Sequence, residues 1–108
     1  MKGLELASFQ IISSVGTAKS LIMEALCLAN EKKYDEAETK ITEANKQLLE
    51  GHHGHVDLIQ KEANGEEVPF SLLFMHAEDQ LMTAMTLRDL AKEMIKMYKL
   101  IHLKGENL

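Results

Sequence analysis

The sequence is poor in the residues that mark several protein classes. Its 108 residues include no Trp, one Pro, one Cys and only 5% aromatic residues. The single cysteine, Cys27, excludes an intramolecular disulfide, and its apolar neighbours predict a buried thiol in a reducing compartment. The net charge is −5 and Arg88 is the only arginine. These two features argue against a nucleic-acid partner, because binding phosphates requires clustered basic side chains.

The sequence also lacks targeting and membrane signals. The opening MKGLELASFQ has no apolar h-region of a secretory signal, and no unbroken apolar run reaches the roughly 20 residues of a bilayer span. Hydrophobic residues make up 45% and charged residues 27% of the chain, which is typical of soluble domains. We therefore expect one cytosolic domain over residues 1–108, with the seven methionines filling much of its core.

The few breaks in the pattern predict an all-helical fold. NGEEVP, residues 64–69, holds the only proline, and helices rarely continue through such a stretch. NEKKY, residues 30–34, is a weaker break, and Asp35 and Glu38 after it have the spacing of a capping box. Short connections between helices of similar length favour antiparallel neighbours. The prediction is an up-down-up three-helix bundle, with helices over residues 4–30, 35–63 and 70–103.

The third predicted helix carries an unusual polar cluster. At about 100° per residue, four polar residues fall within about 60° of one another: His76, Asp79, Gln80 and Thr83. The same face continues with apolar residues, which predicts a buried seam with a polar start: Leu87, Leu90, Met94, Met97, Tyr98 and Ile101. Apolar residues also lie near the opposite, outward side, which predicts a helix covered on more than one side by oligomerisation or a partner: Phe74, Leu81 and Met85.

Spacing alone leaves the role of this cluster open. A histidine satisfied by an aspartate one turn away is a common structural arrangement, and H-x-x-D is a weak motif. A buried carboxylate without a partner costs several kcal/mol, so Asp79 requires a cation, hydrogen-bond donors or water.

A longer string is more specific. HAEDQLMTA, residues 76–84, preceded by NGEEVPFSLLF, resembles the lactose/cellobiose class of IIA components of the bacterial phosphoenolpyruvate-dependent sugar phosphotransferase system. The family signature runs H-A-Q-D-H-L-M-T after G-E-E-x-P-[YF]-S. VGTAKSLIMEAL, residues 15–26, is similar to the family's G-x-A-[RK]-S segment, and residues 33–52 are similar to its second-helix opening, with E-x-H ending at His52. The resemblance covers essentially the whole chain in order.

The resemblance implies a homotrimer of three-helix bundles and a phosphoryl relay. The phosphocarrier HPr donates to a IIA histidine, which passes the group to a cysteine of the IIB component, while the IIC membrane component carries the sugar. His76 matches the phosphorylated histidine. Asp79 matches the aspartate at the trimer axis, often around a divalent, Mg-like metal ion, and no organic cofactor is implied. Gln80 and His52 are expected to line the cleft.

Two positions depart from the family signature. Glu78 replaces the usual Gln, and because it is expected to face outward we predict little effect. Gln80 replaces a second His; it is unable to titrate but still forms hydrogen bonds. Phe74, Met82 and Met85 are candidates either for a docking rim around His76 or for ordinary packing.

Other features favour structural explanations. GHHGH, residues 51–55, suggests a metal site, but polar residues around a helix irregularity or kink fit it better. SSVGTAKS, residues 13–20, favours close helix packing or leaves room beside His76. His102 complements the end of the last helix, and His53 and His55 are expected to be incidental.

Two rival functions remain at this point. ANEKKYDEAETKITEA resembles one turn of a tetratricopeptide repeat, which would make the chain a non-catalytic helical interaction module, but no second copy follows at the 34-residue period. A carboxylate-bridged metal bundle requires two Glu-x-x-His motifs and two further Glu, and this chain has one H-x-x-D. A phosphorylatable His76 separates the relay from both.

Overall fold

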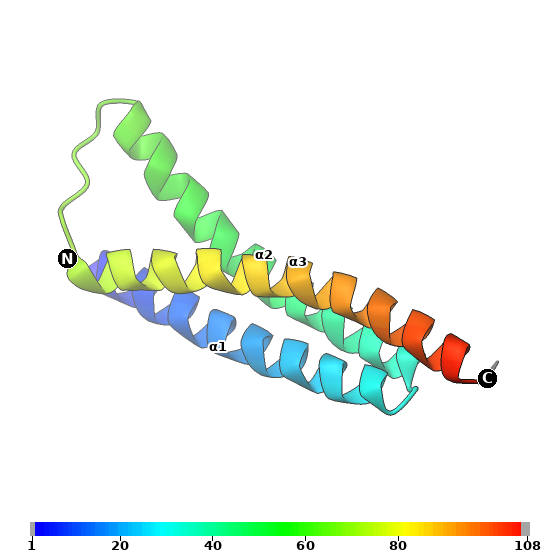
Figure 1. Cartoon of the computed structure of the whole chain (residues 1–108). Coiled ribbons are helices and arrows are strands. Elements are labelled where there is room, and N and C mark those ends of the chain that lie inside the picture. The colour runs from blue at the N-terminus through cyan, green and yellow to red at the C-terminus, as the bar shows by residue number, and fades with distance from the viewer. Residues whose placement is uncertain (1, 107–108) are drawn as a thin grey trace.

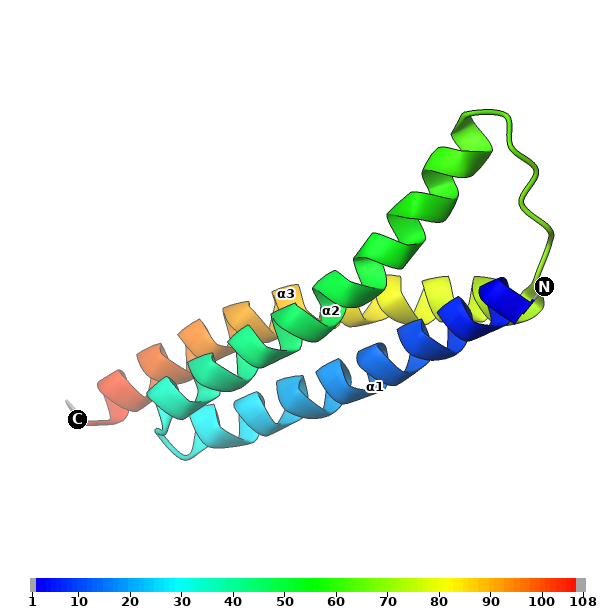
Figure 2. The same ribbon diagram turned by 180° about the vertical axis from the view of Figure 1, so that it is seen from behind.

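Three long helices make up the part of the protein that the structure describes. The computed structural model describes residues 2–106, with α1 over Lys2–Asn30, α2 over Tyr34–Ala63 and α3 over Leu72–Glu106. α1 and α3 run in parallel and α2 runs against both, in a rod of 62 × 21 × 19 Å (Figures 1 and 2). This arrangement confirms the predicted up-down-up three-helix bundle of an all-α chain.

The core is built mainly from small side chains. Eight of its buried residues are alanines, and among the described residues no methionine belongs to it. The expectation that methionine fills the core is therefore wrong. Alanines let helix backbones approach closely, so the large side chains that interdigitate among them are few. The largest fully buried apolar side chains are Val15, Ile22, Leu48, Leu81 and Ile95.

α3 buries a different face from the one predicted. Its buried residues are Ala77, Leu81, Ala84, Ala91 and Ile95, a stripe centred about 100° away from His76. Leu81, expected on the outward side, has 0% exposure, whereas Leu90 and Ile101, expected in the seam, are 56% and 61% exposed. The prediction failed because it followed the large apolar residues, whereas closely packed helices bury the small ones.

The C-termini of α1 and α2 have the same hydrogen-bond pattern. At the end of α1, Lys33 N donates to Leu28 O and Lys32 N to Ala29 O; at the end of α2, Glu66 N donates to Lys61 O and Gly65 N to Glu62 O. These pairs form Schellman motifs, which need one residue in the left-handed region. That residue is Lys32 (φ 68°) in the first turn and Gly65 (φ 84°) in the second.

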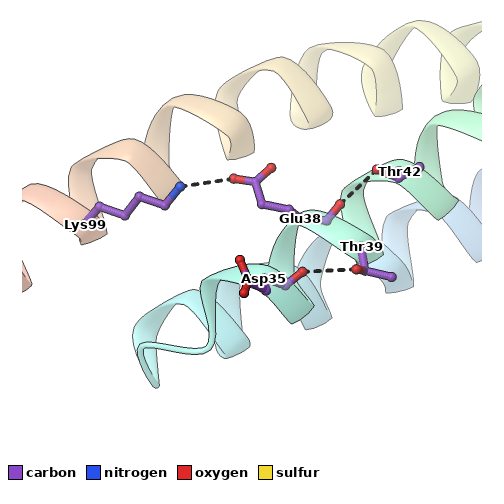
Figure 3. A network of polar contacts seen from close by, with 5 residues as sticks. All are labelled: Asp35, Glu38, Thr39, Thr42 and Lys99. Atoms are coloured by element: carbon purple, nitrogen blue, oxygen red, sulfur yellow. Dashed lines mark hydrogen bonds and ion pairs between the residues drawn. The ribbon is translucent and has the colours of Figure 1, made fainter.

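The predicted capping box at the start of α2 does not form. α2 begins one residue earlier, at Tyr34, with Lys33 as a cap that makes no side-chain hydrogen bond. The Glu38 carboxylate instead forms an ion pair with Lys99 of α3, with Nζ and Oε1 3.4 Å apart. The backbone carbonyl of Asp35 accepts a hydrogen bond from the Thr39 hydroxyl (Figure 3). The carboxylate is thus used between helices rather than at the helix end.

Further contacts fix this end of the bundle. The Tyr34 hydroxyl is hydrogen-bonded to His102 Nδ1, and the rings of Tyr98 and His102 stack with centroids 6.0 Å apart. His102 is therefore structural, as expected, and the start of α2 is tied to the end of α3.

The opposite half of α2 diverges from the other two helices (Figures 1 and 2). The glycines of GHHGH do not interrupt the helix, which continues to Ala63. Only one of the two glycines lies where α2 packs closely on α3. A Cβ on Gly51 would meet Leu81 Cδ1 at 3.3 Å, whereas a Cβ on Gly54 would meet no atom within 4 Å. Gly51 is the last buried residue of α2, and we call the diverging segment that follows, residues 52–63, the α2 arm.

α1 is more apolar than the absence of an unbroken apolar run in the sequence indicated. Gly3–Asn30 is long and apolar enough, by length and composition alone, to cross a membrane. A core helix of a soluble bundle passes the same test. Here the buried stripe of α1, which includes Val15, Ala18 and Ile22, joins a single core with residues of α2 and α3.

Two neighbouring leucines of α2 test this core. Leu48 is 2% exposed and Leu49 is 54% exposed. We expect Leu48→Ala to lower the free energy of unfolding by about 2–5 kcal/mol, because it leaves a cavity, and Leu49→Ala to change it by less than about 0.5 kcal/mol. Chemical denaturation monitored by circular dichroism measures both, and equal losses would contradict the packing described.

Candidate functional site

His76 lies near the start of α3 on its exposed face. The helix is capped by Ser71, whose Oγ accepts from Phe74 N at 3.1 Å, the bond of a serine N-cap to the third helical residue. This cap fixes the first turn, and His76 follows in the second with its side chain exposed. The imidazole is therefore accessible to a macromolecular partner.

The other members of the predicted polar cluster lie one turn or more along the helix. Asp79 and Thr83 are exposed, so Asp79 has the water access that an unpaired carboxylate requires. Gln80 is half-buried and its Oε1 accepts from Lys19 Nζ of α1 at 2.6 Å. The glutamine thus forms hydrogen bonds, as expected for the residue that replaces the second histidine.

Glu78 is half-buried, which corrects the expectation that it faces outward; the prediction that it has little effect stays a prediction. Its Oε1 lies 3.1 Å from His55 Nδ1 of the α2 arm, with side-chain exposures of 26% and 17%. The two atoms are at ion-pair distance, although His55 Nδ1 makes no aligned hydrogen bond. When His55 is protonated, this pair ties the diverging arm to α3, so His55 is not incidental.

His52 lies in a separate hollow. With Leu48, Leu49 and Asn45 from α2 and Met85 and Arg88 from α3, it lines a cavity of about 290 Å³ that does not include His76. Within one chain, His52 and His76 therefore do not share a cleft.

Of the three residues predicted for a docking rim, two pack against the core and one is exposed. Phe74 and Met85 are half-buried against the core, which agrees with their packing interpretation. Met82 is 53% exposed and remains available to a partner.

Two further predictions from the sequence concern the GHHGH segment and the thiol of Cys27. Among residues 2–106, no group of three or more His, Cys, Asp or Glu side chains lies close enough to hold a metal ion. Cys27 is exposed, which corrects the expectation of a buried thiol. It lies beside Met23 and Lys40 in a hollow between α1 and α2.

Sequence reasoning missed Lys19 and His55 as neighbours of the His76 segment. The sequence placed Lys19 only within the family-like segment VGTAKSLIMEAL. Its hydrogen bond with Gln80 joins residues 61 positions apart, and such a contact leaves no periodic signal in the sequence. The signal available for His55 was the unusual Glu78, since an acidic residue replacing an amide creates a need for a positive partner.

Comparison with known proteins assigns the chain to a family. Residues 6–99 match the model of the "PTS system, Lactose/Cellobiose specific IIA subunit" family. The chain belongs to this IIA family. An oligo-beta-mannoside-specific EIIA component of Bacillus subtilis is 44% identical over 88% of this chain and 86% of that protein. A lactose-specific EIIA component of Staphylococcus epidermidis is 36% identical over 89% and 92%.

The fold comparison agrees. The crystal structure of a cellobiose-specific enzyme IIA from Bacillus anthracis matches with a TM-score of 0.91 and 42% identity, over 97% of this chain and 96% of that one. The protein is thus a IIA phosphoryl carrier component of the phosphotransferase system, and membership implies HPr and IIB as partners. This excludes the tetratricopeptide-like module as the description of the chain.

The tie between Glu78 and His55 is testable by hydrogen exchange. We expect Glu78→Ala to speed amide exchange in the α2 arm, because the arm loses its polar contact with α3, while residues 37–48 keep their protection. Glu93→Ala is the control, since Glu93 pairs with Lys96 on its own helix at 3.1 Å. Unchanged exchange in the arm of the Glu78 variant would show that the pair does not hold it.

Proposed function

We propose that His76 is the residue of this IIA component that carries the phosphoryl group. The observation that supports it is the exposure of His76, which lies in the segment HAEDQLMTA that matches the histidine-containing part of the family signature. The His76 side chain is on a capped helix and is exposed, as a residue that exchanges a phosphoryl group with two other proteins has to be.

The chemistry requires little from the protein beyond position and charge. A neutral imidazole nitrogen has a lone pair that attacks phosphorus. As the new N–P bond forms, the bond between phosphorus and the donor group breaks and its electron pair stays on the donor. In the second step a IIB cysteine thiolate forms an S–P bond, and the N–P electron pair returns to His76. In-line positioning and charge stabilisation provide most of the catalysis.

We further propose a cytoplasmic protein that serves the uptake of β-linked disaccharides or oligosaccharides by a IIC membrane component. The named relatives are specific for oligo-beta-mannosides and lactose. This chain handles the phosphoryl group and not the sugar, so the choice of sugar lies largely with the membrane component.

A homotrimer is the assembly we propose, with α3 at its centre. The exposed stripe of α3 carries Leu72, Leu90, Met97 and Ile101, which are 56–73% exposed in one chain. Leu90, Met97 and Ile101 follow one another at seven and four residues, and Leu72 lies 18 residues before Leu90 on the same face, which is the spacing of helices packed side by side. A second and a third copy would remove this apolar surface from water.

Asp79 lies on the same stripe, and its exposed carboxylate fits a divalent cation on the trimer axis. One carboxylate from each chain would provide the oxygen ligands that such ions prefer, and the ion would offset the repulsion among the three charges. No group of metal-ligating residues forms within residues 2–106 of a single chain, so this site would depend on assembly.

Phosphorylation tests the role of His76 directly. We expect incubation with phosphoenolpyruvate, enzyme I and HPr to add one acid-labile phosphate to the chain, measured by intact-mass spectrometry under non-acidic conditions. His76→Ala should gain none, because no other imidazole occupies the signature position. His53→Ala, at an exposed histidine of α2, should gain it normally.

Absence of phosphate on the wild-type chain, with HPr demonstrably charged, would contradict the proposed role. Phosphate on the His76→Ala chain would move the carrier to another histidine.

Native mass spectrometry tests the assembly and the ion together. We expect three chains plus one divalent ion for the wild type, three chains without the ion for Asp79→Asn, and single chains for Leu90→Glu, which places three charges in the apolar contact. Leu49→Glu, an exposed leucine of α2, should remain trimeric. A wild-type monomer would refute the assembly, and an ion retained by Asp79→Asn would refute the ligand.

A further inference from the structure

The phosphorylated form of His76 poses an electrostatic problem in this chain. Phosphorylation adds a charge of about −1.5 to −2 near neutral pH. The formal net charge is already −5, and Asp79 lies one turn beyond His76 on neighbouring positions of the helix surface. Stabilising the carrier state therefore calls for a positive group beside His76.

Lys19 is the positive group that the fold brings to this region. Its Nζ lies 2.6 Å from Gln80 Oε1, and Gln80 is one helical turn after His76 on the same side of α3. Side chains on a helix lean toward its N-terminus. Gln80 therefore leans from its own turn toward that of His76, and its amide oxygen accepts from the ammonium group of Lys19.

The charge of Lys19 is not offset by a carboxylate in the part of the chain that the structure describes. Lys40 pairs with Glu24 at 3.2 Å and Lys99 pairs with Glu38 at 3.4 Å, whereas Lys19 contacts the neutral amide of Gln80. Lys19 is also half-buried, so its attraction for a nearby anion is less screened than that of a fully exposed lysine.

The parallel course of α1 and α3 leaves room for the group. Since Lys19 is level with Gln80, stepping back about one turn on both helices brings Gly16 level with His76. Gly16 is exposed, and a Cβ built on it would meet no atom within 4 Å. The surface of α1 at Gly16 is therefore open.

The orientation of Gln80 provides a second donor. An ammonium group donates hydrogen bonds and accepts none, so the amide atom that faces Lys19 must be the oxygen. The NH2 group of the same amide then points elsewhere and is able to donate to a phosphoryl oxygen. A histidine at this position would offer one N–H in its neutral form, and only one of its nitrogens could accept from the lysine.

We propose that Lys19 and Gln80 form the phosphoryl-binding pair for His76, with Lys19 offsetting the transferred charge and Gln80 positioning the ammonium. The inference rests on the proposed role of His76 and extends it to a residue of α1. During transfer the covalent changes are those already described, and Lys19 neither gains nor loses a proton.

Rapid-quench measurement of transfer from phospho-HPr tests the pair. We expect Lys19→Met to slow acceptance by about tenfold or more, as loss of one charge-stabilising donor does elsewhere, and to shift the equilibrium toward phospho-HPr. Lys19→Arg should recover most of the rate because it restores the charge. Gln80→Leu should show a smaller loss, and Lys46→Met, at an exposed lysine of α2, none.

The outcomes separate the two proposals. A wild-type chain that accepts no phosphate overturns the role of His76 and this pair with it. A wild type that accepts phosphate, with Lys19→Met folded and equally fast, overturns the pair alone. Equal losses in Lys19→Met and Lys19→Arg would make Lys19 a packing residue and not a charge partner.

A measurement on the wild type avoids dependence on variant folding. Side-chain ammonium signals of the lysines, observed by 1H–15N NMR before and after phosphorylation, should shift for Lys19 and stay unchanged for Lys46. A Lys19 signal that does not respond would contradict direct contact with the phosphoryl group.

Discussion

Close packing of alanine-rich helix surfaces is the constraint on which this structure depends. Ala18 and Ala25 of α1, Ala44 of α2, and Ala77 and Ala84 of α3 have 0% exposure, and large side chains such as Ile22 and Leu81 fit between them. This packing decides the rotation of α3. Because Ala77 and Leu81 turn inward, His76 turns outward, and the histidine becomes a surface group on a rigid helix.

The two ends of the bundle are held differently. At one end, Tyr34 and Glu38 of α2 contact His102 and Lys99 of α3. At the other, the α2 arm leaves the bundle and keeps the His55–Glu78 contact as a polar tie. The His76 segment lies at this looser end.

The departures from the family signature show how local chemistry is preserved when residues change. Glu78 introduces a negative charge, and His55 lies at ion-pair distance from it. Gln80 replaces a titratable ring, yet its amide oxygen accepts from Lys19 of α1. Both replaced residues thus contact side chains of other helices. The charges around the HAEDQLMTA segment are therefore set by the whole bundle rather than by the segment itself.

Much was determined by sequence alone. Sparse Gly and Pro limited the three helices to within a few residues of their observed bounds, and the ordered matches around His76 indicated the family. The sequence did not reveal which face of α3 is buried, because alanine carries a weak hydrophobic signal and buries well only when a partner helix approaches closely. Nor did it reveal the Lys19–Gln80 and His55–Glu78 contacts, because they join residues on different helices that only the tertiary packing brings together.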